Sequence, residues 1–220
     1  MKLIIGNKAY SSWSLRGWLA AKQSGLGFEE ITVPLYDGEW DERKRADDLA
    51  PSHGKVPILW DEEVVVWDSL AIIDFLADRV GMARFWPKDE VARGMARAIS
   101  AEMHSSFLAL RRECPMNIRK LFPDHNISDA ARADAIRILQ LWAEARARFG
   151  KKGPYLFGNF SAADIMYAPV VTRFHTYDFK LPGFAQAYLE TIMTHPWMTE
   201  WSDAAANEPW YIEQYETLPA

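Results

Sequence analysis

Residues 54–73 read GKVPILWDEEVVVWDSLAII, and three structural signals follow one another in this stretch. Two short apolar runs, 56–60 and 64–67, are rich in Val and Ile, which favours β-strands. The acidic residues between them suit the turn of a hairpin. A helix is predicted over 68–79, because Asp68 is a typical N-cap and the apolar residues that follow repeat at helical spacing.

The sequence before this stretch alternates strand and helix patterns. Residues 2–6 and 28–34 predict strands, and residues 12–24 predict a helix. The charged segment 37–48 predicts a solvated loop with a short helix. The order is therefore β-α-β-α-β-β-α, in which the βαβ unit requires a parallel pair and the hairpin adds an antiparallel edge.

The character of the chain changes after residue 80. We predict a domain over 1–80, a linker with Pro87 over 81–88, and an all-helical domain over 89–220. The predicted helices cover residues 90–112, 128–149, 161–174, 183–193 and 196–205. The predicted fold class is α+β, with an N-terminal α/β domain followed by an all-helical C-terminal domain.

Composition excludes several classes of protein. The net charge of −5 argues against a nucleic-acid partner, since phosphates need a basic surface. A single cysteine, Cys114, excludes an internal disulfide and CxxC redox or zinc sites, and we expect no metal. No apolar run is long enough to span a membrane and no signal-peptide pattern is present, so we expect no membrane partner and a cytoplasmic protein.

Residues 160–165 have the pattern that starts a helix. Ser161 and Asp164 occupy the two positions of a capping box, in which Ser161 accepts from the N–H of Asp164 and Asp164 accepts from the N–H of Ser161. Phe160 and Ile165 occupy the staple positions. We interpret this segment as structural.

Ser11 and Ser12 stand where the first strand gives way to the first helix. Serine at such a junction is most often a helix cap, and equally its hydroxyl can serve a site. On the residues alone, both interpretations stay open for each serine.

Four pieces of the sequence together resemble the cytosolic glutathione S-transferases, in particular serine-type, zeta/theta-like bacterial members. They are Ser11–Arg16, Gly54–Leu59, Trp67–Ile73 and the capping segment that begins at Ser161. The resemblance covers essentially the whole chain. It implies a thioredoxin-like N-terminal domain, a homodimer, and glutathione as cosubstrate, bound by the first domain.

The resemblance also implies that one serine hydroxyl donates to the glutathione sulfur. The zeta-like pattern favours Ser11 and the theta/delta-like pattern favours Ser12; we prefer Ser11. Trp13 stands where zeta-like members have cysteine, which argues against maleylacetoacetate isomerisation and against disulfide exchange. Arg16 is either a buried structural residue, which we prefer, or a charge near glutathione, and Tyr10 is a weaker candidate than either serine.

For glutathione binding, the resemblance implies a cis Val56–Pro57 bond, with the backbone of Val56 pairing with the cysteinyl part. Lys55 is expected to meet a carboxylate or to be solvated. Asp68 is expected to bind the α-ammonium group, and Ser69 the α-carboxylate at the helix N-terminus. Trp13 completes the predicted glutathione site.

The second substrate is expected between the domains, near His104, Phe107 and Arg111. His104 is the one group there with a pKa near neutral, but a lone histidine on a helix is more often a packing residue than a catalyst. Arg111 and Arg112 fit either an acidic substrate or a solvated surface.

The predicted function is a glutathione transferase that activates the thiolate for attack on an electrophilic small molecule, as in detoxification. The alternatives are a glutathione-dependent isomerase or peroxidase, and a non-catalytic relative that serves in protein interaction or regulation. A nucleotide-dependent enzyme has little support, because neither GxGxxG nor a P-loop follows the first strand.

Overall fold

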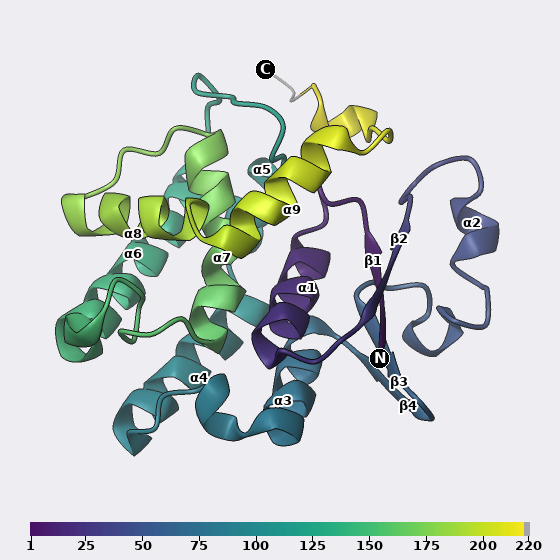
Figure 1. Cartoon of the computed structure of the whole chain (residues 1–220). Coiled ribbons are helices and arrows are strands. Elements are labelled where there is room, and N and C mark those ends of the chain that lie inside the picture. Colours follow the sequence, from purple (N-terminus) through teal and green to yellow (C-terminus); the bar gives the residue numbers. More distant parts are fainter. Residues whose placement is uncertain (218–220) are drawn as a thin grey trace.

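A four-stranded mixed sheet forms the N-terminal part of the molecule (Figure 1). The computed structural model describes residues 1–217 of the 220. The strands are β1 (Lys2–Gly6), β2 (Glu29–Val33), β3 (Ile58–Asp61) and β4 (Val64–Trp67), in the order β2-β1-β3-β4. β1 pairs in parallel with β2 and antiparallel with β3, and β3 and β4 form the predicted hairpin.

Two helices pack on this sheet and a third, short helix lies beyond it. They are α1 (Ser12–Ser24), α3 (Ser69–Val80) and α2 (Trp40–Arg43). α1 packs against α3 and also against a helix of the C-terminal part, so it lies between the sheet and the helical domain (Figure 1). The observed order β-α-β-α-β-β-α confirms the predicted topology and the thioredoxin-like fold.

The C-terminal part is helical, as predicted. Its helices are α4 (Glu90–Ser105), α5 (Leu108–Glu113), α6 (Asp129–Phe149), α7 (Ala162–Thr176), α8 (Gly183–Met193) and α9 (Pro196–Asn207). Short 3₁₀ turns occur at Ala50–Ser52, Met82–Arg84, Gly150–Lys152 and Glu213–Tyr215. The domain limits at the linker 81–88 stay a prediction.

One predicted helix is wrong in its extent. The predicted helix 90–112 is broken into α4 and α5, because Ser106 is extended and Phe107 has a left-handed backbone with φ of 63°. Arg111 stabilises the break by donating from Nε to the carbonyl oxygen of Ser106 at 3.0 Å. The break turns Phe107 into the core, where its side chain is 5% exposed.

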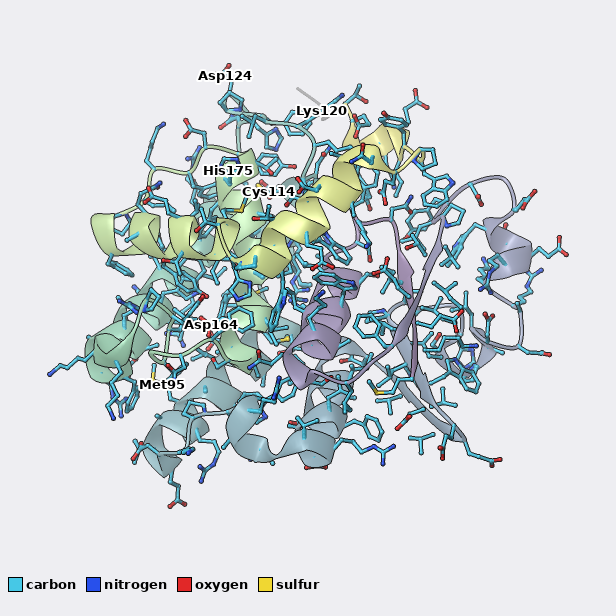
Figure 2. The ribbon with its side chains drawn as sticks, in the orientation of Figure 1. Met95, Cys114, Lys120, Asp124, Asp164 and His175 are labelled. Carbon is cyan, nitrogen blue, oxygen red and sulfur yellow. The ribbon has the colours of Figure 1, made fainter. Side chains whose placement is uncertain are left out.

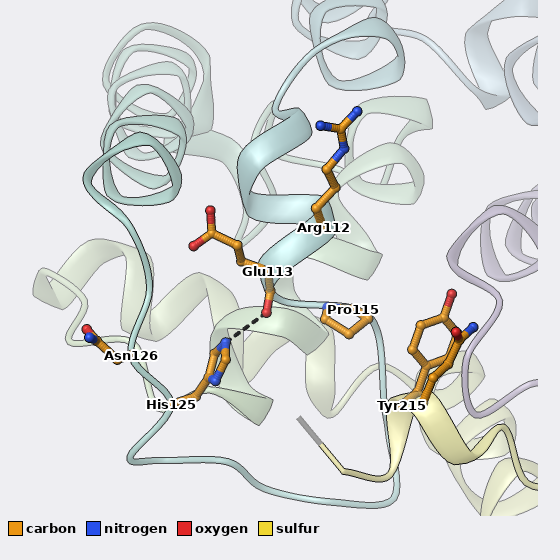
Figure 3. Close-up of a pocket in the computed structure, with 7 residues that line it drawn as sticks. Arg112, Glu113, Pro115, His125, Asn126 and Tyr215 are labelled. Carbon is orange, nitrogen blue, oxygen red and sulfur yellow. Dashed lines mark hydrogen bonds between the residues drawn. The ribbon is translucent and has the colours of Figure 1, made fainter. Parts of the chain in front are cut away.

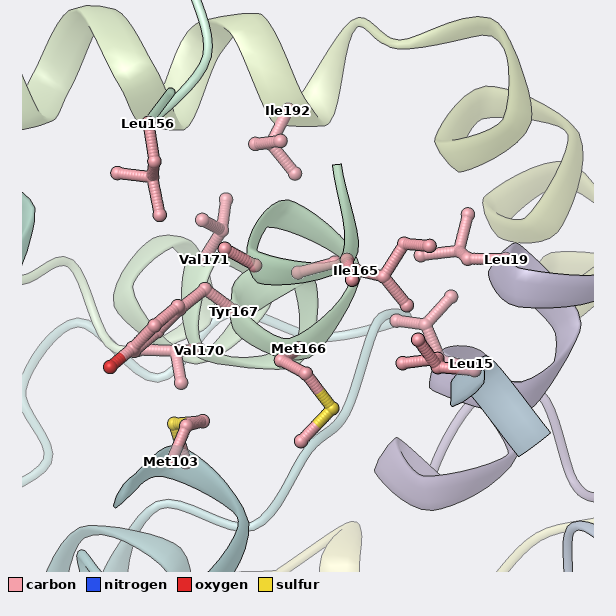
Figure 4. Close-up of a cluster of buried hydrophobic side chains, with 14 of the residues drawn as sticks. Leu15, Leu19, Met103, Leu156, Ile165, Met166, Tyr167, Val170, Val171 and Ile192 are labelled. Atoms are coloured by element: carbon pink, nitrogen blue, oxygen red, sulfur yellow. The ribbon is translucent and has the colours of Figure 1, made fainter. Parts of the chain in front are cut away.

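The core is continuous from the sheet to the last helices, through α1 and α7. Leu15 and Leu19 of α1 face Ile165 of α7, with Met166 beside them (Figure 4). Arg16 of α1 also bonds to α7, since its Nε donates to the carbonyl oxygen of Met166 at 2.9 Å. The expectation of a buried, structural Arg16 is therefore met, and its partner lies in the C-terminal domain.

Asp164 anchors the start of α7 and lies among the C-terminal helices (Figure 2). One carboxylate oxygen accepts from the N–H and the hydroxyl of Ser161, and the other accepts from the N–H of Leu156 and the hydroxyl of Tyr188. The reciprocal cap predicted for Ser161 and Asp164 is present, and Asp164 is also the centre of a wider network.

Candidate functional site

A cavity of about 840 Å³ lies between the sheet domain and helices α4, α5 and α7. It is lined by most of the predicted site residues: Ser11, Ser12, Trp13, Lys55, Val56, Pro57, Asp68, Ser69, His104 and Arg111. The prediction for Phe107 is wrong, because the break between α4 and α5 directs it into the core and it does not line the cavity.

Ser11 caps α1, and its hydroxyl is engaged within the protein. Its Oγ accepts from the N–H of Ser14 at 3.3 Å and donates to Oγ of Ser14 at 2.7 Å. The Ser14 hydroxyl in turn accepts from the N–H of Gly6 at 2.9 Å, which ties the end of β1 to α1. The sequence reasoning missed Ser14, which is fully buried and serves the backbone.

Ser12 is placed differently. It is the first residue of α1, and its Oγ accepts from Nη2 of Arg173 at 3.3 Å. Within residues 1–217 its own hydroxyl hydrogen has no acceptor. Because the neighbouring cation polarises this hydroxyl, Ser12 can donate to an anion in the cavity.

Arg173 was also missed by the sequence reasoning. It is buried in α7 and anchored by two backbone acceptors, the carbonyl oxygens of Cys114 at 2.8 Å and Pro169 at 3.0 Å. The available signal was a charged residue within the otherwise uncharged and mostly apolar run of residues 165–174, since charged residues are seldom buried without a partner.

The peptide bond between Val56 and Pro57 is cis, as the resemblance implied. Pro57 packs closely on α1 at Gly17, where a Cβ atom would lie 2.6 Å from Cγ of Pro57. This close approach places the backbone of Val56 beside the start of α1. Lys55 lies on the cavity wall with an exposed side chain.

Asp68 and Ser69 open α3 at the cavity. Oδ1 of Asp68 accepts from the N–H of Leu70 at 2.9 Å, and Oδ2 lies 3.2 Å from Nε2 of His104. The hydroxyl of Ser69 is buried and has no hydrogen-bond partner within the described chain. A polar ligand at this helix N-terminus would therefore find both a free hydroxyl and free N–H groups.

Trp13 lies between cationic and aromatic groups. The guanidinium carbons of Arg16 and Arg111 are 4.6 Å and 4.8 Å from the centroid of its ring, within the range of cation–π attraction. The ring of His104 meets the indole edge-on, with centroids 5.4 Å apart.

Tyr10 and Cys114 are not available as nucleophiles or donors. The Tyr10 hydroxyl donates to Oε1 of Glu216 at 2.6 Å, and burial, followed by this carboxylate, raises its pKa to about 12. Cys114 is buried below the C-terminal helices (Figure 2), and burial raises its thiol pKa to about 12. Any thiolate chemistry in the cavity therefore needs a thiol from the ligand.

The C-terminal segment closes part of the cavity. Ile212 and Tyr215 line it, and Glu216 holds the segment by bonds to Tyr10 and Asn117. The sequence reasoning placed no site residue in this segment, because its contacts with the start of the chain are long-range.

A second, smaller hollow of about 330 Å³ adjoins this cavity, and Pro115 and Tyr215 line both (Figure 3). Arg112, Glu113 and His125 line it, and a ring nitrogen of His125 lies 2.9 Å from the carbonyl oxygen of Glu113. Arg112 therefore belongs to this hollow, whereas its neighbour Arg111 lines the larger cavity.

In the part of the chain that the structure describes, no helix has the length and apolar character needed to cross a membrane. Across the same residues, no group of three His, Cys, Asp or Glu side chains is arranged to hold a metal ion.

Comparison of the sequence with family models gives two matches in chain order. Residues 10–79 match the glutathione S-transferase N-terminal domain, and residues 126–204 match the glutathione S-transferase C-terminal domain. The two matches cover about two thirds of the chain. Glutathione S-transferase GstB of Escherichia coli K12 is 26% identical over 166 residues, which are 72% of this chain and 80% of GstB.

Solved structures show the same fold. A glutathione transferase homologue from Burkholderia BGR1 with bound glutathione has a TM-score of 0.67 at 20% identity, covering 93% of this chain and 96% of that one. A diazinon-metabolizing glutathione S-transferase of the silkworm Bombyx mori has a TM-score of 0.71 at 16% identity, covering 93% and 97%.

Proposed function

The chain belongs to the glutathione S-transferase family, and we propose that it is a glutathione transferase that directs the glutathione thiolate at an electrophilic small molecule. The observation that carries this proposal is the Ser12 hydroxyl, which faces the cavity with its hydrogen unused while Arg173 polarises its oxygen. The free hydroxyl of Ser69 in the same cavity supports a polar ligand at the start of α3.

A thiolate needs stabilisation at neutral pH, because a free cysteine thiol has a pKa near 8.5. A hydrogen bond to a charged group is worth about 1.5–3 kcal/mol, which corresponds to roughly one to two pKa units. We propose Ser12 as the donor in preference to Ser11, since the Ser11 hydroxyl already donates to Ser14. The N-terminus of α1 adds partial positive charge beside the sulfur.

Glutathione would extend from Ser12 along the cavity wall. Its cysteinyl backbone would pair with Val56, as an added strand does. Its α-ammonium group would meet Asp68, and its α-carboxylate the hydroxyl and N–H groups at Ser69. Lys55 would meet the glycyl carboxylate at the open side. Trp13 would close the site beside the sulfur.

The second substrate would occupy the part of the cavity lined by Trp13, His104 and Arg111, with Leu108 and Tyr215 as apolar walls. The thiolate attacks the electrophilic carbon, and no protein nucleophile is required. We further propose a cytoplasmic homodimer that acts in detoxification, as the resemblance to the family implies.

The test is calorimetric titration of glutathione into the protein, with the absorbance of the bound thiolate followed against pH. We expect Ser12→Ala to raise the pKa of the bound thiol by a unit or more, while Ser11→Ala leaves it within about 0.3 units. Absence of glutathione binding at millimolar concentration would overturn the proposed function. A shift with Ser11→Ala alone would reassign the donor.

A further inference from the structure

Three arginines lie near one another beside the cavity: Arg111 and Arg173 line it, and Arg16 is fully buried next to Trp13. Arg16, Arg111 and Arg173 form no ion pair with any acidic side chain of residues 1–217. Buried charges are ordinarily paired, because removing an ion from water costs several kcal/mol. A cluster of unpaired cations is therefore a feature that an anionic ligand would explain.

Neutral groups hold the guanidinium groups of Arg111 and Arg173 in place. Arg111 donates to the carbonyl oxygens of Ser106, Met103 and His104, and within the described chain its Nη1 donates to no atom. Arg173 donates to two backbone carbonyl oxygens and to the Ser12 hydroxyl. These contacts fix the geometry of the donors but carry no negative charge. Carboxylates act on the cluster only without direct contact, Asp134 on Arg111 and Asp68 on Arg16.

The charges act on one another. Burial first, and then the neighbouring Arg111, lower the pKa of Arg173 to about 10. Burial also lowers the pKa of Arg16, with Arg111 and Arg173 as the next causes, whereas Asp68 opposes the shift. Since Arg16 and Arg111 both approach the ring of Trp13, cation–π attraction offsets only part of this repulsion.

The cluster exceeds what glutathione alone requires. One thiolate at Ser12 would compensate one of the three positive charges. Asp68 makes its direct contact with His104 and with none of the three arginines. Arg111 and Arg173 both line the cavity, so the remaining charge is available to whatever binds beside the sulfur. The planar fork of a guanidinium suits a carboxylate, which can accept two parallel hydrogen bonds.

We propose that the electrophile itself carries a carboxylate, and that Arg111 and Arg173 bind it beside the glutathione sulfur. The inference rests on the proposed function, because it names the substrate class of the same site. With an aryl chloride as the electrophile, the S–C bond forms and the C–Cl bond breaks. Chloride leaves with the bonding electron pair, and the thiol proton passes to solvent.

Binding is tested first, without chemistry. The protein is saturated with S-methylglutathione, whose sulfur cannot ionise, and titrated with 3-nitrobenzoate or with its neutral analogue 3-nitrobenzamide. We expect the carboxylate to bind at least tenfold more tightly than the amide. Arg111→Gln should remove most of this preference, and Arg111→Lys should keep part of it. Arg112→Gln is the matched control, because Arg112 lines the other hollow and should leave the preference unchanged.

Turnover gives the second readout. The kcat/KM values for 4-chloro-3-nitrobenzoate and 4-chloro-3-nitrobenzamide, each divided by the uncatalysed rate with glutathione, should favour the acid at least tenfold. Arg111→Gln should lower this ratio tenfold, whereas Arg112→Gln should leave it unchanged.

The outcomes separate this inference from the proposed function. Equal binding of acid and amide to the S-methylglutathione complex overturns the inference and leaves the transferase proposal standing. Competition between nitrobenzoate and S-methylglutathione also overturns it, because the arginines would then serve a carboxylate of glutathione. Failure of both S-methylglutathione and glutathione to bind overturns the proposed function itself.

Discussion

The carboxylate of Asp68 and the imidazole of His104 meet across the cavity, with Oδ2 and Nε2 3.2 Å apart. Asp68 opens α3 in the sheet domain, whereas His104 lies near the end of α4 in the helical domain. The other oxygen of Asp68 caps the N–H of Leu70. His104 therefore contacts Oδ2 of Asp68, the oxygen that the α-ammonium group of glutathione is proposed to use.

Removal of the imidazole should free that oxygen. Since the cap at Leu70 already orients Asp68, we expect His104→Leu to bind glutathione a few-fold more tightly, as measured by calorimetry at constant pH. His175→Leu is the control, because His175 is exposed and does not line the cavity. Weaker binding by His104→Leu would mean that the imidazole positions Asp68 and does not compete for it.

Ser14 should contribute more to stability than a surface serine. Ser14→Ala would leave the buried N–H of Gly6 without its acceptor, which costs about 1–3 kcal/mol. Ser105→Ala, on the exposed end of α4, should change the free energy of unfolding by less than about 0.5 kcal/mol. Urea denaturation of both variants measures the difference, and equal effects would contradict the role assigned to Ser14.

Gly17 should be intolerant of a side chain. In Gly17→Ala the new Cβ would meet Pro57, so α1 and the 54–57 loop must move apart, at a cost of about 1–3 kcal/mol. Gly94→Ala is the matched control in α4, because nothing lies within 4 Å of its Cβ position. It should stabilise the protein by about 0.5–1 kcal/mol. Thermal unfolding of the two variants should therefore shift in opposite directions, and a shift in the same direction would refute the contact.

Asp164 should make stability depend on pH. Burial raises its pKa from 3.8 to about 6, so the folded protein binds this proton more tightly than the unfolded chain does. Its contribution is present below about pH 4 and is lost as the pH rises through 6, by about 3 kcal/mol in total.

The matched variant isolates this effect, because Asp164→Asn does not titrate. The free energy of unfolding of the wild type relative to Asp164→Asn is measured by urea titration at pH 4 and at pH 7. It should fall by about 2 kcal/mol between these two pH values, since part of the contribution is already lost at pH 4. A gap that is constant or widens with pH would mean that the hydrogen bonds from Ser161, Tyr188 and Leu156 outweigh burial.

The sheet domain follows from local patterns. Hairpin residues 58–67 alternate between strand and turn signals, and the limits of α1 match the predicted helix, because caps and apolar spacing act over a few residues. The prediction of one continuous helix over 90–112 is wrong because the break in it has no local sequence signal. No local signal marks Phe107, and the break depends on packing and on the contacts of Arg111.

The residues of the candidate site also fall into two groups, those that local motifs predict and those that only the tertiary fold brings to the cavity. Asp68, Ser69 and Val56 were predicted because their roles lie in short motifs next to helix and strand ends. Arg173 and Tyr215 come from segments more than 100 residues away from those motifs, and only the tertiary fold brings them to the cavity. The choice between Ser11 and Ser12 also depended on partners that the sequence does not reveal.

The placement of α1 has a consequence for recombination between relatives. One face of this helix packs on the sheet and α3, and the other packs on α7, where Arg16 donates to Met166. An exchange of residues 1–80 for those of a related transferase would pair a foreign α1 with the native α7. Functional chimeras will therefore need α1 and α7 from the same parent. The two helices must be exchanged together, although 137 residues lie between the end of one and the start of the other.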